Sequence, residues 1–166
     1  MKKTVSAKTL RAILRYNKRT GIFRWKIRPR QRACSVIAGT VNPCGYRQIC
    51  IAQRIYKAHR LAWFYVNGRW PKGEIDHING DRDDNRMANL RLANKKENQA
   101  NSKIRVTNTV GLKGVTRPQP GRTKFTSKIT VDYKRIWLGS FEDAGDAHAA
   151  YCVAALKYFG DFARAA

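Results

Sequence analysis

The first 73 residues contain no aspartate or glutamate, although they carry 18 lysines and arginines. The whole chain of 166 residues has 34 basic and 11 acidic residues, which gives a formal net charge of +23. A charge surplus of this size opposes compaction and favours a partner of the opposite sign. The composition therefore predicts a nucleic acid as the partner, with an anionic membrane surface as the weaker alternative.

Long hydrophobic runs are also missing. The longest, Leu61 to Val66, is far shorter than the ~18 residues that a membrane span needs. The opening MKKT resembles the start of a signal peptide, but Lys8, Arg11 and Arg15 interrupt any apolar segment behind it. We therefore expect a soluble, cytoplasmic protein.

The four cysteines lack the paired CxxC spacing and the following histidine pair of a zinc finger. Without a secretion signal we expect them to be reduced thiols, buried or half-buried in the fold. They are Cys34, Cys44, Cys50 and Cys152.

What the sequence does contain is a sudden acidic cluster. Five acids fall within eleven residues: Glu74, Asp76, Asp81, Asp83 and Asp84. One interpretation is a set of turn residues and helix caps, which favour Asp. The other is a site for a hard cation such as Mg²⁺, which takes oxygen ligands. Composition alone leaves the two open.

The segment before this cluster predicts a mixture of helices and strands. Ser6 is a plausible N-cap for a short amphipathic helix over 6–16, and glycines divide 21–52 into short strands and turns. Residues 55–68 are typical of a helix that ends at Gly68.

Residues 74–101 predict a strand, a long loop, a second strand and a helix. Ile75 and Ile78 flank the first strand, Asn79-Gly80-Asp81 is a turn signal, and residues 90–92 alternate like a second strand. Asn94 and Glu97 have the residue types of a capping box that opens the helix.

The C-terminal part predicts a different unit. Residues 102–111 are polar and are expected to form a linker. Three strands follow within 112–117, 124–131 and 135–141, with a tight turn at Asp132-Tyr133. A helix is expected to open at Ser140 with a capping box and to end at Gly160. The fold class is therefore α+β.

Hydrolysis of DNA needs a base for the attacking water and a cation for the developing charge. His77 is the only histidine in the acidic cluster, and its ordinary pKa near 6.5 suits a general base. Asp76 and Asn98 could each give an oxygen to one ion. Adjacent strand residues point to opposite faces, so Asp76 and His77 serve one site only at a strand end or an irregularity.

The order of these residues resembles the HNH endonuclease family, most closely its phage and homing type. The resemblance is carried by five pieces: residues 59–62 (HRLA), 75–77 (IDH), 84–86 (DNR), 89–91 (NLR) and 98–99 (NQ). It implies a ββα-metal fold, His77 as the general base, and Asp76 with Asn98 as ligands of one divalent metal ion. It also implies that Asn89 holds the loop between the strands by hydrogen bonds.

An asparagine at the third position favours Mg²⁺ over zinc, with Mn²⁺ also possible. Asn94 and Asn101 are the competing assignments for that position. Upstream, residues 20–26 (TGIFRWK) and 59–71 also resemble phage relatives, so the likeness covers about residues 16–101. We expect a nuclease domain with a basic extension over 1–101, a linker over 102–111 and a second domain over 112–166.

The second domain resembles the APETALA/ethylene-response-factor family, on Gly114-Val115, residues 136–141 (IWLGSF) and residues 150–160 (AYCVAALKYFG). That resemblance implies a three-stranded antiparallel sheet that lies in the DNA major groove and packs on one helix. The candidate DNA contacts carried over by position are Arg117, Lys124, Lys128, Arg135 and Trp137.

Simpler interpretations compete for several residues. His59 could be a second catalytic imidazole, but its apolar helical context favours a structural role by roughly two to one. The basic residues Arg28, Arg30, Arg32 and Arg47 are expected to contact phosphates, because no acid is nearby.

The sequence thus predicts a divalent-metal-dependent DNA endonuclease acting on double-stranded DNA, in the host-cell cytoplasm if it is phage-encoded. A monomer is favoured, since one site nicks one strand most simply. Homing, DNA packaging and attack on host DNA are all compatible with the residues. The alternatives are a DNA-binding regulator or architectural protein with a vestigial nuclease unit, and an RNA-binding protein, which the charge alone supports.

Overall fold

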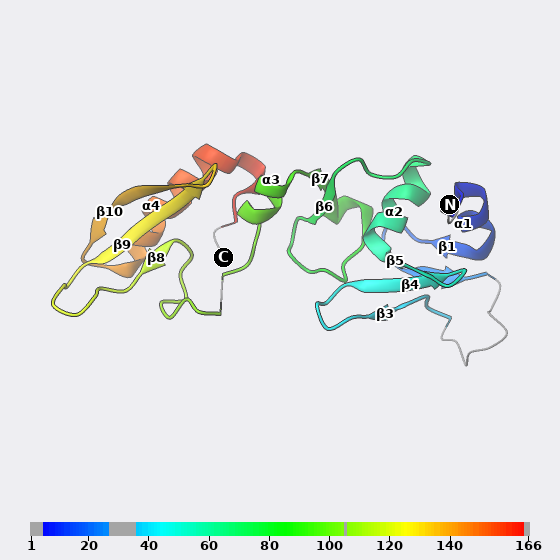
Figure 1. The fold of residues 1–166 in the computed structure, drawn as a ribbon, viewed down its shortest axis with the longest axis horizontal. Helices are drawn as coiled ribbons and strands as arrows, with labels where there is room; N and C mark the ends of the chain where they lie inside the picture. Colours follow the sequence, from blue (N-terminus) through cyan, green and yellow to red (C-terminus); the bar gives the residue numbers. More distant parts are fainter. Residues whose placement is uncertain (1–4, 27–35, 105, 165–166) are drawn as a thin grey trace. The chain divides into compact units, whose positions relative to one another are not determined.

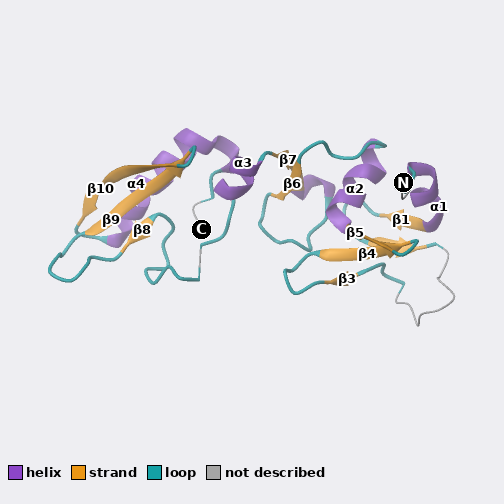
Figure 2. Ribbon diagram, in the orientation of Figure 1, coloured by secondary structure: helices purple, strands orange, loops and turns teal. Residues whose placement is uncertain are grey.

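The computed structural model describes residues 5–26, 36–104 and 106–164, and its contacts divide the chain into two units, Met1–Ala93 and Asn94–Ala166 (Figure 1). Over the described residues the architecture is mixed α/β, with four α-helices and several small antiparallel sheets (Figure 2). In this part of the chain, no helix combines the length and the apolarity that crossing a membrane requires.

The first unit opens with helix α1 (Ala7–Ile13), in which the Ser6 side chain accepts a hydrogen bond from the Thr9 amide. The helix expected over 6–16 ends at Ile13. The residues that follow form strand β1 (Leu14–Tyr16) because they pair with β2 (Phe23–Trp25). The helical spacing of the apolar residues gave no sign of this pairing with a later segment.

The next sheet has the order β3-β4-β5. Its strands are Thr40–Val41, Arg47–Ile51 and Arg54–Lys57. β2 and β4 confirm the strands expected within 21–52, whereas β5 lies beyond that range. Ala52 and Gln53 join β4 to β5 with φ of 47° and 61°, as a two-residue hairpin turn requires.

Helix α2 (Ala58–Asn67) follows β5 directly. The expected start at residue 55 was therefore wrong, because residues 54–57 pair with β4 instead. The expected stop at Gly68 is confirmed, since this residue adopts φ of 69° and its amide bonds to the Phe64 carbonyl. α2 packs on α1, β4 and β5.

The predicted strand, loop and strand are present as β6 (Glu74–His77), a loop with the short helix η1 (Met87–Asn89), and β7 (Leu90–Ala93). Beneath these elements lies a core from the whole unit. Its fully buried side chains include Leu10, Leu14, Phe23, Ile49 and Leu61.

The second unit begins with α3 (Lys95–Ala100). Asn94 and Glu97 form the expected capping box. The sheet that follows has the order β10-β9-β8, with strands Val115–Thr116, Phe125–Val131 and Lys134–Phe141. Asp132 and Tyr133 make the expected tight turn at φ of 50° and 64°.

Helix α4 (Ala144–Phe159) covers this sheet, and η2 (Gly160–Phe162) follows it. Its N-cap is Asp143, which accepts from the amides of Gly145 and Asp146, and not the expected Ser140, which belongs to β10. A Cβ at Gly145 would lie 2.8 Å from the capping Oδ1, which explains a glycine in the first turn of a helix.

The cysteines differ from expectation in part. Cys44, Cys50 and Cys152 are free thiols, as expected. Cys44 and Cys50 are exposed rather than buried, because Cys44 lies in the turn before β4 and Cys50 alternates along β4 with the buried Ile49 and Ile51. Cys34 lies outside the described residues.

Candidate active site

The β6–β7 hairpin places Asp76 and His77 at a buried strand end. Ile75, Asp76 and His77 are all at most 7% exposed, whereas Glu74 is exposed. Burial of three consecutive residues breaks the two-sided alternation of an ordinary half-exposed strand. Asp76 faces Arg91 across the hairpin, and His77 faces Leu90, the last pair before the loop.

The loop after His77 is held by its own asparagines. Asn89 is 6% exposed; its Oδ1 accepts from the Asn79 amide at 3.0 Å, and its Nδ2 donates to the Asp84 carbonyl at 2.8 Å. The Ile78 amide donates to the Asn89 carbonyl at 3.0 Å. These bonds give one fixed conformation to a segment without regular secondary structure.

Most residues of the acidic cluster accept hydrogen bonds that hold this loop. Asp83 accepts from Arg47 in a two-bond ion pair at 2.8 Å, and Asp84 accepts from Arg86 and from Asn79. The bonds from Arg86 lower the pKa of Asp84. Over the described residues, no group of three or more His, Cys, Asp or Glu side chains could hold a metal ion. The hydrogen bonds of Asp81 to the Asp83 amide, of Asp83 to Arg47 and of Asp84 to Asn79 fit the turn-residue interpretation for these three acids.

Asp76 is engaged differently. Arg91 donates to its Oδ2 from Nε at 2.9 Å and from Nη2 at 2.8 Å. Both side chains are largely buried, at 7% exposure for Asp76 and 18% for Arg91. A charged pair on two facing strands in a low-dielectric site fixes the orientation of the carboxylate.

The imidazole of His77 is 5% exposed, and its Nε2 lies 3.4 Å from Oδ1 of Asn85. Burial lowers the pKa of His77, while the contact with Asn85 and the nearby Asp76 act in the opposite direction. The ring is therefore neutral at pH 7. A neutral imidazole is the form that can accept a proton.

The sequence did not predict that His59 lies next to His77. Its ring lies 5.0 Å from the ring of His77 and perpendicular to it, and 5.4 Å from the ring of Tyr46. It is 5% exposed, and its Nδ1 has no hydrogen-bond partner among the described residues. Burial, and then the charges of His77, Lys57 and Arg60, lower the pKa of His59 to about 3.

The three candidates for the third position of the motif lie in or directly beside α3, in the second unit. Asn98 lies within α3, and Asn101 follows its last residue. Asn94 uses its side-chain oxygen as the N-cap, accepting from the amides of Lys96 and Glu97 at 2.9 and 3.0 Å. The side-chain oxygen of Asn94 is therefore already bonded to the helix amides, which weakens the assignment of Asn94 as a metal ligand.

The donor set fits a hard cation rather than a soft one. Asp76 offers a carboxylate and Asn98 an amide oxygen, and no thiolate accompanies them in the motif. Mg²⁺ commonly takes one or two protein oxygens and completes its shell with water and substrate phosphate. By its chemistry alone, each of these two oxygens suits an ion of the Mg²⁺ type, and the Asp76 carboxylate already accepts from Arg91.

In the second unit, one face of the β9–β10 pair is basic. Directly paired antiparallel residues lie on the same face. Ile129 pairs with Ile136, and both belong to the core under α4. Lys128 pairs with Trp137, and Thr130 with Arg135, so these residues lie on the opposite face.

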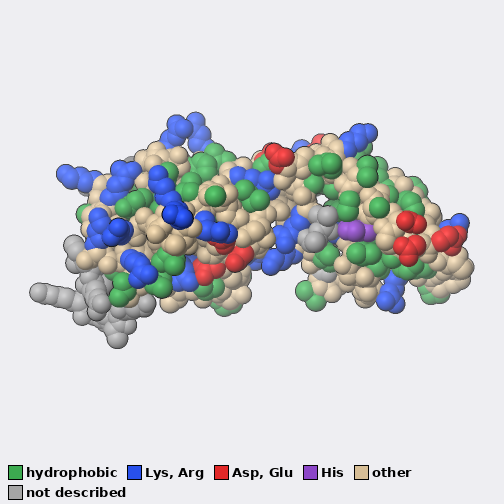
Figure 3. Space-filling model, turned by 180° about the vertical axis from the view of Figure 1, so that it is seen from behind, with side chains coloured by type: hydrophobic (Ala, Val, Ile, Leu, Met, Phe, Trp, Pro, Cys, Tyr) green, Lys and Arg blue, Asp and Glu red, His purple; other side chains and the backbone are tan. Residues whose placement is uncertain are grey.

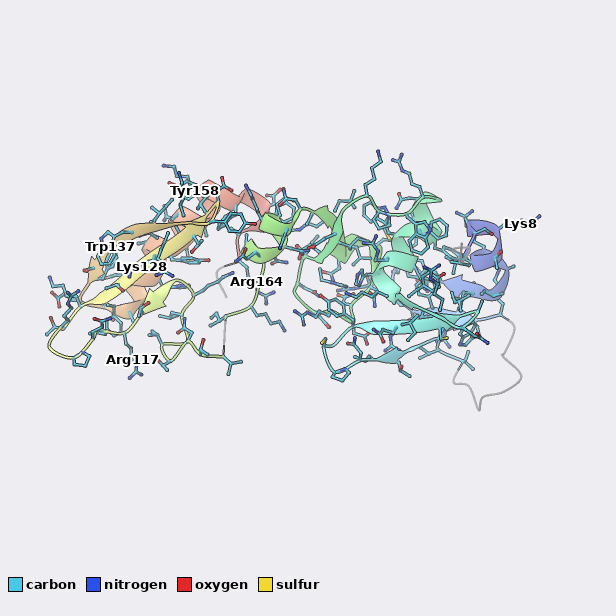
Figure 4. The ribbon with its side chains drawn as sticks, viewed as in Figure 1. Lys8, Arg117, Lys128, Trp137, Tyr158 and Arg164 are labelled. Atoms are coloured by element: carbon cyan, nitrogen blue, oxygen red, sulfur yellow. The ribbon has the colours of Figure 1, made fainter. Side chains whose placement is uncertain are left out.

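Lys128 and Trp137 lie side by side on this face (Figure 4), with Nζ 5.4 Å from the indole ring centre. Trp137 is 53% exposed, and Arg135 and Arg117 are also exposed. Lys124 makes an exposed ion pair with Glu142 at 2.9 Å.

The basic N-terminal residues are only partly described. Arg28, Arg30 and Arg32 lie outside the described residues. Arg47 is half-buried in its ion pair with Asp83. Lysine and arginine side chains are nevertheless spread over the visible face of the first unit, which lies on the left in Figure 3.

Comparisons with known proteins find similarity over parts of the chain. A model of the family "HNH endonuclease" matches residues 56–100, a segment that includes Asp76, His77, Asn89 and Asn98. The chain is 46% identical over 87 residues to Protein 3.8 of Escherichia phage T7, which covers 50% of this chain and 71% of that protein.

Two plant proteins are also similar. One is an AP2/ERF and B3 domain-containing transcription factor of Arabidopsis thaliana, 41% identical over 56 residues, or 34% of this chain. The other is dehydration-responsive element-binding protein 1E of Oryza sativa subsp. indica, 31% identical over 101 residues, or 60% of this chain. The chain spans 15% and 46% of their respective lengths. No solved structure matches the chain.

Proposed function

Because this chain belongs to the HNH endonuclease family, we propose that it is a divalent-metal-dependent DNA endonuclease of the phage type, with a second unit that binds double-stranded DNA. The observation that carries this proposal is His77. A neutral, buried imidazole lies beside the carboxylate of Asp76 at the start of a rigid loop, within the segment that the family model matches.

In the proposed reaction, His77 takes a proton from a water molecule, and that water attacks the scissile phosphorus. The bond to the 3′ oxygen breaks, which leaves a 5′ phosphate and a 3′ hydroxyl. Asn89 keeps the loop between β6 and β7 in place, so that the imidazole does not have to be ordered during the reaction. Arg91 holds the carboxylate of Asp76 in one orientation.

Asp76 and Asn98 would hold one ion, most simply Mg²⁺ with Mn²⁺ as a substitute. When bound, such an ion neutralises charge that develops on the scissile phosphate and on the leaving oxygen. The proposal draws on the inclusion of both residues in the matched segment 56–100 and on their oxygen chemistry.

The second unit would provide affinity for DNA. Lys128, Arg135 and Trp137 share the sheet face opposite α4, where cations can reach phosphates and base edges. Arg117 is exposed after β8, and Lys124 precedes β9; both would extend this surface. The names of the two plant relatives, a transcription factor and an element-binding protein, support the same interpretation.

The test is relaxation of a supercoiled plasmid by the wild type and by His77→Ala, with Mg²⁺ or with EDTA. We expect open circles only from the wild type with metal, and a fall of about 10²- to 10⁴-fold for His77→Ala. A gel shift by His77→Ala should remain unchanged. A wild type that shifts the plasmid but never relaxes it, with several metals and DNAs, would support a DNA-binding regulator instead.

A further inference from the structure

Two cations lie over one aromatic ring beside the candidate base. In the first unit, Nζ of Lys57 is 4.5 Å and Cζ of Arg82 is 4.9 Å from the ring centre of Tyr46. The same ring lies 6.1 Å from the ring of His77 and 5.4 Å from that of His59. Both cations belong to the segment 56–100 that the family model matches, although the sequence motifs selected neither of them.

The turn between β3 and β4 fixes Tyr46. Its amide donates to Oδ1 of Asn42 at 2.9 Å, and its carbonyl accepts from the Asn42 amide at 2.9 Å. Gly45 adopts φ of 84° in this turn, a conformation that favours glycine. Lys57, the last residue of β5, pairs with Gln48 of β4, two residues after Tyr46. Side chains two residues apart along an extended backbone lie on one face, so the lysine reaches the tyrosine ring.

Arg82 reaches the same ring from the loop between β6 and β7. Its Nη1 donates to the carbonyl oxygen of Cys44 at 2.9 Å, which ties this loop to the β3–β4 turn. The ion pair of Arg47 with Asp83 joins the start of β4 to the same loop. Unlike the buried polar groups of this hairpin, Arg82 is exposed, so its remaining N–H groups can reach a ligand.

Among the described residues, no carboxylate forms an ion pair with Lys57 or Arg82. Three arginines of this region do have such partners: Arg47 with Asp83, Arg86 with Asp84 and Arg91 with Asp76. The aromatic ring attracts both remaining cations but does not neutralise them. Two cations that are held close together without a carboxylate attract an anion from solution.

We propose that Lys57 and Arg82, both held over the ring of Tyr46, form a phosphate-binding site for the DNA strand that passes His77. This inference rests on the proposed function for the identity of that strand and for its cleavage. Contacts from lysine and arginine to phosphates position a strand without reading its sequence. The site would therefore give the first unit its own affinity for DNA and hold the strand in register with the candidate base.

Binding in EDTA tests the site without cleavage. The affinity of the full chain for a mixed-sequence DNA duplex is measured by fluorescence anisotropy over a range of salt concentrations. Lys57→Ala and Arg82→Ala should each reduce the slope of log affinity against log salt by about 0.9, and the double variant by about 1.8. Because such contacts contribute little at ~1 M salt, the double variant should bind about 60-fold more weakly at ~0.1 M.

Arg11→Ala is the matched control. Arg11 is an exposed arginine of the same unit that also lies over a tyrosine ring, that of Tyr65 at 5.6 Å, and donates to the Tyr65 carbonyl at 2.8 Å. The ring of Tyr65 packs on Tyr16 and Phe23, so Arg11 belongs to a different aromatic cluster. This variant should keep the wild-type slope. Arg82→Lys, which retains the charge, should keep most of the slope too.

Plasmid nicking with Mg²⁺ relates the site to cleavage. A contact that is equally strong in the ground state and in the transition state changes KM and leaves kcat unchanged. We therefore expect the double variant of Lys57 and Arg82 to need more plasmid for half-maximal nicking and to reach the wild-type kcat.

Two results would overturn the phosphate site. One is a double variant with the wild-type salt slope or the wild-type KM. The other is a change of slope in Arg11→Ala as large as that in Arg82→Ala, which would indicate general positive charge. If the wild type nicks no DNA but the slopes fall as expected, the proposed nuclease function fails and the phosphate site stands. If nicking requires His77 while the slopes stay unchanged, the nuclease function stands and the phosphate site fails.

Discussion

The hairpins β6–β7 and β9–β10 use polar side chains in opposite ways. In β6–β7 and its loop, Asp76, His77 and Asn89 are at most 6% exposed and are bonded to other polar groups. In β9–β10, the polar face turns outward, with Trp137 53% exposed beside Lys128. Both hairpins are antiparallel, so the direction of strand pairing does not account for the difference.

This contrast distinguishes what proton transfer requires of polar side chains from what binding of a polyanion requires of them. Proton transfer needs groups held in one geometry, and burial with full hydrogen bonding supplies that at a cost in desolvation. Binding of a polyanion needs cations that reach a partner from the surface, where their interactions depend on salt. A substitution in the first hairpin should therefore affect stability and rate, and one in the second should affect affinity.

The largest expected effect on stability comes from Arg91→Ala. It leaves the carboxylate of Asp76 buried without its guanidinium partner, and breaking such a pair costs about 3–5 kcal/mol. We expect a loss near the lower end of this range, since Arg91 is 18% exposed. Urea unfolding of the full chain measures it.

The matched control for Arg91→Ala is Lys124→Ala. Lys124 pairs with Glu142 at 2.9 Å, but both side chains are more than half exposed. Water screens such a pair, so its loss should leave the unfolding midpoint within error. Equal midpoint shifts for the two variants would show that burial does not distinguish the hairpins.

The second prediction concerns acid. His59 has a folded pKa of about 3 against an ordinary value of 6.5. Above pH 6.5 the imidazole is neutral in both states and contributes no pH dependence. Below it, the unfolded chain binds a proton that the folded chain does not, so stability falls as pH falls. From pH 6.5 to 5 the loss reaches about 2 kcal/mol for this residue.

The His59→Gln variant should lack the part of the acid-induced loss of stability that His59 causes. This holds even though the variant is less stable than the wild type at pH 7. Urea unfolding at pH 7, 6 and 5 gives the slope for each variant. His148→Gln, in the second unit, is the control and should keep the wild-type slope for the first unit. A His59→Gln slope identical to that of the wild type would contradict the buried, neutral state of His59.

The sequence predicted the β6–β7 unit well because its signals are local. Asn79-Gly80 marks the turn, residues 90–92 alternate, and Asn94 with Glu97 caps the next helix. Three polar residues of the site, Asp76, His77 and Asn89, could be selected from these signals and from the resemblance. Their roles stay predictions until the variants are measured.

What the sequence did not contain is the packing between distant segments. The perpendicular contact of His59 with His77 joins residues 18 positions apart through the placement of α2, and an apolar context suggested only a structural histidine. The pairing of Leu14–Tyr16 with β2 likewise overrode a helical pattern. The partnership of Asn85 with Asp83 and His77 depends on the loop conformation, which spacing cannot supply.

The smallest expected effect tests the outward face of the second hairpin. Lys128→Ala should weaken DNA binding and reduce the slope of log affinity against log salt by about 0.9, the value of one released counterion. Lys157→Ala is a closely matched control, because Lys157 also lies over an aromatic ring, that of Tyr158 at 5.7 Å, but on α4. Only the lysine on the sheet face should change the slope. If both substitutions change it equally, general positive charge binds the DNA and the sheet face has no special part; if neither does, the first unit supplies the contacts.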